Sequence, residues 1–152
     1  MLLVVRNMPL DVLTILKGDL IATPLHWAAR AGHVQIVTLL FRRGADLFVQ
    51  DAQGYNALHL AVHAGHLMMI VYLITIGIPV DSRDTMGRTP LMWSAYQGNC
   101  MEGMQEIIKS GALLDLVDST GYTALHWSVI SLHYNFAKVY SATIASYWYS
   151  YC

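Results

Sequence analysis

Apolar residues recur at helical spacing in two successive segments of the chain, and the pair of segments is then repeated. The second segment carries one apolar face, made by Val34, Ile36, Val37, Leu39 and Leu40. The first segment begins with Thr23-Pro24, a typical N-cap followed by a first helical position, and its apolar residues are Leu25, Ala28 and Ala29. Gly32 and Gly44 follow the two segments, where glycine ends helices because it accepts a positive φ. The pattern predicts a helix, a turn and a second helix.

A four-residue line at the start of the first segment occurs four times. Its copies start 33, 33 and 34 residues apart, and they are Thr23-Pro24-Leu25-His26, Asn56-Ala57-Leu58-His59, Thr89-Pro90-Leu91-Met92 and Thr123-Ala124-Leu125-His126. Between the first two copies, Asp51-Ala52-Gln53-Gly54 has the composition of a tight turn. A period of this length is typical of ankyrin repeats. We therefore predict an all-α ankyrin-repeat solenoid, built of helix-turn-helix units with extended finger loops, whose units must stack to bury their apolar faces.

The period divides the chain into three full repeats and a partial fourth. The repeats span residues 23–55, 56–88, 89–122 and 123–140, between a segment 1–22 that could cap the first repeat and an apolar, aromatic tail 141–152. The third copy has one additional residue, so we expect a longer turn after Gly98 and a second helix that restarts near Met104. In the fourth copy Leu132 replaces the helix-ending glycine. The tail lacks the polar face of a solenoid cap, which predicts aggregation of the purified chain and suggests a protein cut short.

Composition narrows the functional class. Apolar residues make up 55% of the chain and charged residues only 12%, which indicates additional interface or a piece of a larger protein. The net charge of −1 argues against a nucleic-acid partner. Two cysteines with no paired spacing fit a reducing compartment. Residues 55–80 lack Asp, Glu, Lys and Arg and resemble a membrane span, but the repeat period places a turn at Gly65, so we predict two helices and no membrane span in this chain.

The repeat pattern explains most residues that could otherwise suggest a metal or catalytic site. The spacing of His59, His63 and His66 suggests a metal site, but six of the seven histidines fall at two positions of the repeat, so we predict no metal. Asp51, Asp84 and Asp118 each precede a glycine by three residues, so turn formation explains them better than paired catalytic carboxylates. The sequence has no nucleophile elbow, phosphate loop or dinucleotide fingerprint. We predict a chain without catalytic activity or cofactor.

Tryptophans occupy one register of the repeat. Trp27, Trp93 and Trp127 each follow the four-residue line, and Leu60 fills the slot in the second copy. This slot can be core packing, or it can form an aromatic row beside the groove between the first helices and the fingers, where tryptophan is enriched in binding hot spots. The candidate partner-binding residues are Trp27, Trp93, Trp127, Arg30 and Tyr96.

Three segments carry a narrower resemblance. Residues 18–33, 87–96 and 123–127, with a tryptophan after the four-residue line in each, resemble the ankyrin region of the ankyrin-repeat DHHC palmitoyltransferases. The resemblance implies cytosolic repeats that select substrate proteins, joined to a membrane-bound enzyme of the Golgi or other endomembranes. It also implies a peptide-binding groove that contains Trp27, to which an upstream repeat contributes that we do not find in residues 1–22. The Asp-His-His-Cys segment that transfers the acyl group is absent here.

The sequence thus favours a non-catalytic module that binds an extended peptide or loop of another protein, as the substrate-recognition part of a palmitoyltransferase-like protein. One alternative is a free-standing cytosolic ankyrin adaptor or inhibitor. A second is a fragment of a palmitoyltransferase from an incomplete gene model. The coding sequence beyond Cys152 separates them, because an in-frame DHHC segment favours the enzyme and a genuine stop favours the adaptor.

Overall fold

A computed structural model describes residues 22–151 of the chain, and these residues form four pairs of α-helices. The pairs are α3 (Pro24–Arg30) with α4 (Val34–Arg42), α5 (Ala57–Ala64) with α6 (Leu67–Thr75), α7 (Pro90–Gln97) with α8 (Met101–Lys109), and α9 (Ala124–Ile130) with α10 (Tyr134–Tyr151). The described part of the chain contains no strand. The predicted all-α repeat fold is confirmed.

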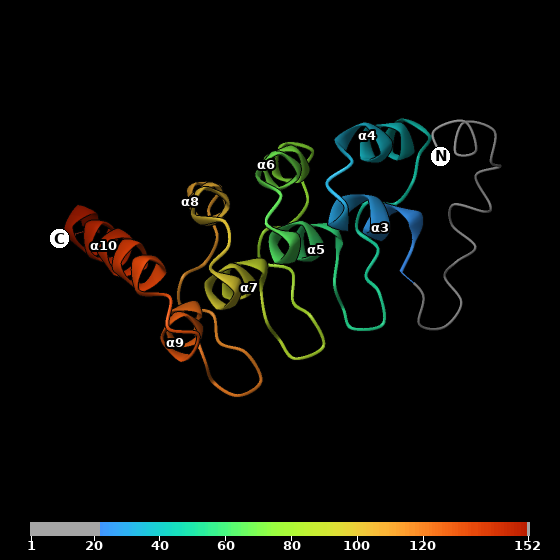
Figure 1. The fold of residues 1–152 in the computed structure, drawn as a ribbon. Helices are drawn as coiled ribbons and strands as arrows, with labels where there is room; N and C mark the ends of the chain where they lie inside the picture. Colours follow the sequence, from blue (N-terminus) through green and yellow to red (C-terminus); the bar gives the residue numbers. More distant parts are fainter. Residues whose placement is uncertain (1–21, 152) are drawn as a thin grey trace.

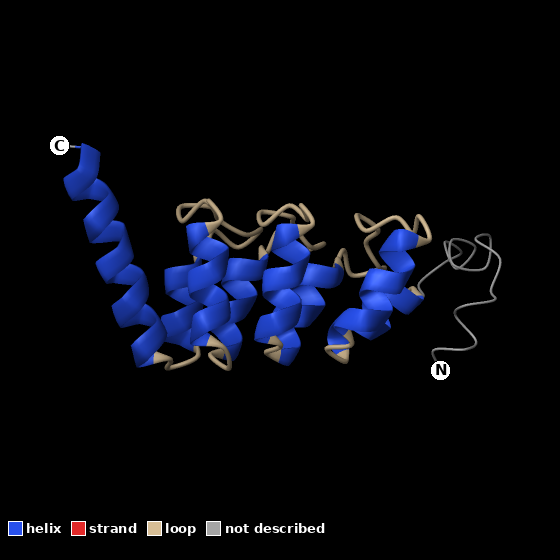
Figure 2. Cartoon of the chain, turned by 90° about the horizontal axis from the view of Figure 1, so that it is seen from above, coloured by secondary structure: helices blue, strands red, loops and turns tan. Residues whose placement is uncertain are grey.

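The first helices and the second helices form two rows, and α10 slants away from the other second helices at the C-terminal end (Figures 1 and 2). The first helices α3, α5, α7 and α9 stack on one another in sequence, and each packs against its own second helix. The connecting segments 43–56, 76–89 and 110–123, here called the finger loops, project beyond the row of first helices (Figure 1). The fold therefore presents one continuous surface made of first helices and finger loops.

The first helices begin where the four-residue line predicts. Thr23, Asn56, Thr89 and Thr123 are the N-cap residues of α3, α5, α7 and α9. The Asn56 side chain accepts a hydrogen bond from the His59 amide, which satisfies one of the free donors at the helix start. Proline takes the first position of α3 and α7, where no amide hydrogen is needed.

The core runs unbroken along the solenoid between the two rows. The leucine of the four-residue line is almost fully buried in the first three copies, with Leu58 at 0% exposure. The second helices face it with buried aliphatic and aromatic side chains, including Val37, Ile70, Ile107 and Phe136. Each copy completes the core of its neighbour, as stacking requires.

The second helix of the third copy begins earlier than expected. α8 starts at Met101 rather than near Met104, so only the turn before it takes up the additional residue. Cys100 is the N-cap, and its sulfur accepts a hydrogen bond from the Gly103 amide at 3.3 Å. Gly103 is tolerated inside the helix because Ile70 fills the space of its missing side chain: a Cβ would lie 2.7 Å from Ile70 Cδ1.

Two further expectations meet the structure near the ends of the chain. The apolar, aromatic tail is helical, because the second helix of the fourth copy continues to Tyr151 and no glycine or proline occurs between residues 134 and 151. The helical cap expected within residues 1–22 lies, apart from its last residue, outside the described residues.

The uncharged stretch 55–80 divides into α5 and α6 at Gly65, whose φ of 74° ends the first of these helices. Of the helices described, none combines the length and apolar character that crossing a membrane requires.

Candidate functional site

Each finger loop is held by one aspartate. One carboxylate oxygen of Asp84 accepts hydrogen bonds from the backbone amides of Met86 and Arg88 at 2.8 and 2.9 Å, while the Gly87 amide donates to the Asp84 carbonyl oxygen at 2.9 Å. Asp51 and Asp118 make the same pattern in their own loops. These carboxylates form turns, as the sequence predicted, and each lies in its own loop rather than in a catalytic pair.

The second carboxylate oxygen anchors a tryptophan nine residues later. Trp93 Nε1 donates to Asp84 Oδ2 at 3.0 Å, and Trp127 Nε1 donates to Asp118 Oδ2 at 2.9 Å. Burial on its own raises the pKa of Asp118, but the hydrogen bonds from Thr120, Tyr122 and Trp127 outweigh it and hold that pKa below its usual range. The finger turn thus fixes the orientation of the indole ring beside it.

Histidines of the four-residue line tie the first helix of a copy to the finger loop that follows it. The Thr23 amide donates to Nδ1 of His26 at 3.0 Å, so Nε2 carries the proton and donates to the Tyr55 carbonyl oxygen at 2.9 Å. His59 makes the equivalent bond to the Arg88 carbonyl oxygen at 3.2 Å. Burial lowers the pKa of both imidazoles, which favours the neutral form that these bonds require. In the third copy this position is Met92, which has no donor.

A second set of side chains bridges the repeats. They lie at the turn between the two helices of the second, third and fourth copies, and each places a side-chain nitrogen 3.0 to 3.1 Å from a carbonyl oxygen of the preceding copy. The nitrogens are Nε2 of His66, Nδ2 of Asn99 and Nε2 of His133. Most histidines therefore have structural partners. Among residues 22–151, no group of three or more His, Cys, Asp or Glu side chains is placed to hold a metal ion.

Aromatic side chains form a continuous cluster over α5, α7 and α9. Tyr96 packs edge-to-face between two indoles, with ring centroids 6.0 Å from Trp93 and 5.6 Å from Trp127. Tyr55 and Tyr122 extend the cluster at its two ends, at 5.4 Å from Trp93 and 6.0 Å from Trp127. The ring planes of these four pairs cross at 82 to 90°, the edge-to-face geometry that aromatic rings prefer.

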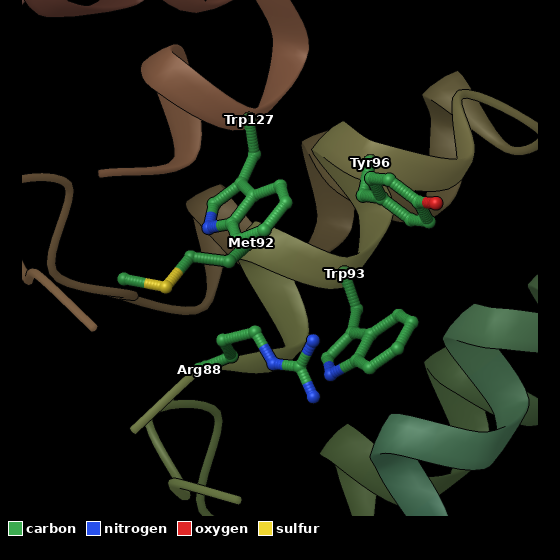
Figure 3. Close-up of a pocket in the computed structure, with 5 residues that line it drawn as sticks. All are labelled: Arg88, Met92, Trp93, Tyr96 and Trp127. Atoms are coloured by element: carbon green, nitrogen blue, oxygen red, sulfur yellow. The ribbon is translucent and has the colours of Figure 1, made fainter. Parts of the chain in front are cut away.

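A cavity opens within this cluster. It has a volume of about 180 Å³ and is lined by Arg88, Met92, Trp93, Tyr96 and Trp127 (Figure 3). Tyr96 is 45% exposed, whereas both tryptophans are half-buried and Met92 is buried. The cavity lies at the junction of the third and fourth copies, on the surface made of first helices and finger loops.

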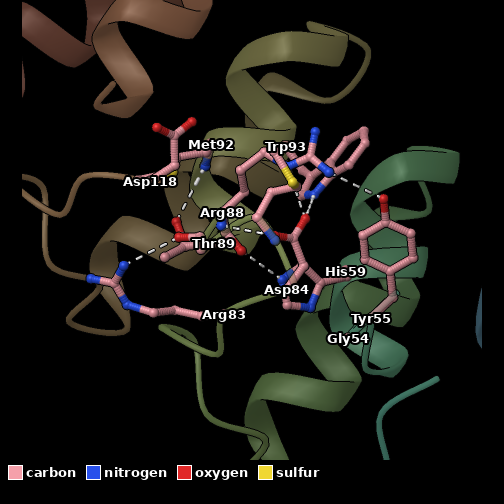
Figure 4. A network of polar contacts seen from close by, with 12 residues as sticks. Gly54, Tyr55, His59, Arg83, Asp84, Arg88, Thr89, Met92, Trp93 and Asp118 are labelled. Carbon is pink, nitrogen blue, oxygen red and sulfur yellow. Dashed lines mark hydrogen bonds and ion pairs between the residues drawn. The ribbon is translucent and has the colours of Figure 1, made fainter. Parts of the chain in front are cut away.

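Arg88 connects the cavity to the finger network. Its Nε donates to Asp84 Oδ2 at 2.9 Å, and its guanidinium carbon lies 4.4 Å from the ring centroid of Trp93 (Figure 4). One terminal nitrogen donates to the Tyr55 hydroxyl at 3.4 Å. Burial raises the pKa of Tyr55, with Arg88 acting in the opposite direction, so this hydroxyl remains neutral at physiological pH. The guanidinium is thereby fixed over an aromatic face.

The predicted site residues fall into two groups. Trp93, Tyr96 and Trp127 meet at the cavity, whereas Trp27 and Arg30 lie on α3. Trp27 is 59% exposed and Arg30 is also exposed, so neither belongs to the core. Helix α5, which carries Leu60 in the same register, separates α3 from α7 (Figure 1).

Sequence reasoning missed part of the cavity wall. Arg88 and Met92 line it, and Asp84 and Asp118 orient its indoles. The signal was present in the spacing, because an aspartate stands nine residues before Trp93 and another stands nine residues before Trp127. Met92 was visible as the one departure from histidine among the four lines.

Comparison with known proteins supports the repeat assignment. The family model of ankyrin repeats matches residues 1–84 and 65–140. Among curated proteins, the chain is similar to palmitoyltransferase Hip14 of Drosophila melanogaster, with 54% identity over 115 residues, and to palmitoyltransferase ZDHHC17 of Homo sapiens, with 53% identity over 117 residues. It is 43% identical over 117 residues to palmitoyltransferase AKR1 of Lachancea kluyveri.

The extent of these matches is uneven. They cover 74 to 76% of this chain but only 16 to 18% of the three relatives. The matched part of this chain consists of its ankyrin repeats, so the resemblance seen in the sequence is confirmed for this region.

Proposed function

Because the chain belongs to the ankyrin-repeat family, we propose that it is a protein-binding module that holds an extended peptide or loop of another protein. We further propose that it serves substrate recognition in a palmitoyltransferase-like protein, and that Trp27, Arg30, Trp93, Tyr96 and Trp127 contact the partner. The homology to the repeats of three palmitoyltransferases supports the second part. In this proposal the chain contributes recognition and no chemistry.

The exposure of Trp27 is the observation that carries the proposal. An indole that is 59% exposed contributes little to the core and costs free energy in water, yet it stands on a first helix beside the finger loops. Tryptophan is among the residues most enriched in binding hot spots, since it buries a large rigid surface on contact. A partner segment lying along the first helices would cover it.

Replacing Trp27 with alanine tests the binding role. Peptides selected from a random displayed library on the immobilised chain supply the probe, and fluorescence anisotropy measures their affinity. We expect Trp27→Ala to weaken binding by about 2 kcal/mol, or roughly 30-fold, as hot-spot truncations do. The thermal midpoint should stay within about 2 °C of wild type, because the side chain lies outside the core.

Phe41→Ala is the matched control, because Phe41 is a 45% exposed aromatic residue of the same copy on the second helix α4. It should leave peptide affinity unchanged. Unchanged affinity in Trp27→Ala would refute the binding role, and a large loss of thermal stability in that variant would show Trp27 to be a core residue.

Competition tests the link to palmitoylation. An excess of this chain should inhibit S-acylation of a substrate protein by human ZDHHC17, because homologous repeats would compete for the same substrate segment. The Trp27→Ala variant should not inhibit, and the chain alone should transfer no acyl group. Equal inhibition by both forms, or acyl transfer by the chain itself, would contradict the proposal.

A further inference from the structure

The cavity between the third and fourth copies has a distinct chemical character. The indole N–H groups of its two tryptophans are already bonded to Asp84 and Asp118. What faces the cavity is therefore mainly aromatic surface, the Met92 side chain and the Arg88 guanidinium (Figure 3). An occupant gains little from its own hydrogen-bond acceptors at the indoles and much from dispersion and ring contacts.

The volume limits the occupant to one side chain. Pockets for drug-sized ligands span about 300–1,000 Å³, whereas an engineered apolar cavity of about 150 Å³ binds benzene. The cavity here, at about 180 Å³, has the size for one six-membered ring. It is too small for a cofactor or a second segment of chain.

The wall chemistry selects the kind of side chain. Arg88 repels a lysine or arginine, and its pairing with Asp84 at 2.9 Å reduces what a carboxylate could gain. An aromatic ring, in contrast, gains a cation–π contact with Arg88, a sulfur contact with Met92 and an edge-to-face contact with Tyr96. An aliphatic side chain gains only buried area.

The cavity lies where the third four-residue line and the residue before it differ from the others. Met92 stands where the other lines have histidine, and Arg88 precedes this line, whereas Ala22, Tyr55 and Tyr122 precede the other three. In the first two copies the histidine spans to the next finger loop, as His26 does to Tyr55 at 2.9 Å. The thioether makes no such bond and lines the cavity instead.

We propose that this cavity receives one uncharged aromatic side chain, a phenylalanine ring, from the protein partner. The proposal rests on the proposed function, because it gives the groove a second anchor point beyond Trp27. It assigns specificity to Arg88, Met92, Trp93, Tyr96 and Trp127 for a ring at one position of the bound segment.

The probe is N-acetyl-phenylalanine amide, compared with the corresponding leucine, proline and lysine amides. Titration into the ¹⁵N-labelled full chain is followed at the indole Nε1–H resonances of Trp93 and Trp127. We expect saturable shifts of both resonances with the phenylalanine amide, about fivefold weaker binding of the leucine and proline amides, and none of the lysine amide. The Trp27 resonance should not move.

Tyr96→Ala removes one wall and should weaken the phenylalanine amide about fivefold or more. Tyr122→Ala is the matched control, because Tyr122 is 41% exposed and touches Trp127 without lining the cavity, so binding should persist. Met92→His restores the residue of the other copies and should also weaken binding, and circular dichroism confirms that each variant folds. Equal affinity for the phenylalanine and leucine amides, or equal loss in Tyr96→Ala and Tyr122→Ala, would overturn the assignment.

The two proposals fail separately. If the amides do not discriminate but Trp27→Ala still weakens peptide binding, the ring assignment is wrong and the binding module stands. If Trp27→Ala binds peptides like wild type while Trp93 and Trp127 respond to the phenylalanine amide, the proposed groove at Trp27 is wrong.

Discussion

Leu132 occupies a backbone conformation that favours glycine, and its replacement should stabilise the protein. Its φ is 60°, and the corresponding residues Gly32, Gly65 and Gly98 have φ of 73°, 74° and 60°. The leucine side chain is 88% exposed, so packing gives little in return for the strained backbone. We expect Leu132→Gly to raise the stability of the fourth copy.

The magnitude follows from three opposing contributions. A left-handed conformation costs a residue with a Cβ about 1–2 kcal/mol. Glycine gives back about 0.4–1 kcal/mol of this through the greater freedom of its unfolded chain. The small covered part of the leucine side chain is worth about 0.3 kcal/mol. The net gain is about 0.5 kcal/mol, which raises the thermal midpoint of a chain this size by about 1–2 °C.

Urea and thermal unfolding followed by circular dichroism measure the gain, and hydrogen exchange of the α9 and α10 amides locates it, because a repeat protein can open at one end first. Leu132→Ala is the decisive control, since it removes the side chain but keeps the Cβ. Glycine should exceed alanine by about 1 kcal/mol. If the two variants are equally stable, backbone strain at this position is not the cause.

Three further predictions concern the finger loops and the side chains bonded to them. The free energy of unfolding should be constant above about pH 7 and fall below pH 6.5, by up to about 1.4 kcal/mol per pH unit for each of His26 and His59, because burial lowers the pKa of both side chains in the folded state and the unfolded chain binds the protons first. Urea midpoints measured across this pH range test the prediction, and a flat profile would contradict it. Gly54→Ala should lower the free energy of unfolding by about 2 kcal/mol or more, since its Cβ would lie 2.7 Å from a backbone nitrogen of the next finger loop, whereas Gly44→Ala, which has a similar φ but open space around it, should lower it by only about 1 kcal/mol. Equal losses of stability in the two variants would show that the contact between finger loops does not matter. Trp127→Phe should destabilise the chain by about 1.5–3 kcal/mol through the lost indole bond to the finger carboxylate, and an unchanged urea midpoint would show this bond to be neutral.

The sequence was sufficient for the repeating parts of the structure. The four-residue line located the N-caps, and its leucines are core residues in the first three copies, because one local pattern specifies both the cap and the buried face. It also identified the turn aspartates correctly. It misplaced the start of α8, because the additional residue was expected to lengthen the turn as far as Met104, whereas Gly103 lies inside the helix and its missing side chain makes room for Ile70.

The candidate site could be predicted only in part. The register of the tryptophans was visible, but exposure was not: Trp27 is 59% exposed, whereas Trp93 and Trp127 are half-buried and bonded to finger carboxylates. That difference depends on contacts between copies, which a single repeat period does not encode. The cavity at Arg88 and Met92 likewise requires three-dimensional packing of two neighbouring copies.

Differences between copies therefore mark where recognition should be sought. The turn aspartates, which all three finger loops share, build the solenoid, and their hydrogen bonds within it account for them. Met92 replaces the histidine of the other lines, Arg88 replaces the tyrosine that precedes two of them, and both line the same cavity. A histidine at the position of Met92 could have spanned to the next finger loop, as His59 does, so the methionine forgoes a bond that links the first helix to the finger loop in the first two copies. A stability cost retained at a half-open aromatic cavity is what a binding surface requires, and it makes this junction the place where partner selectivity should first be tested.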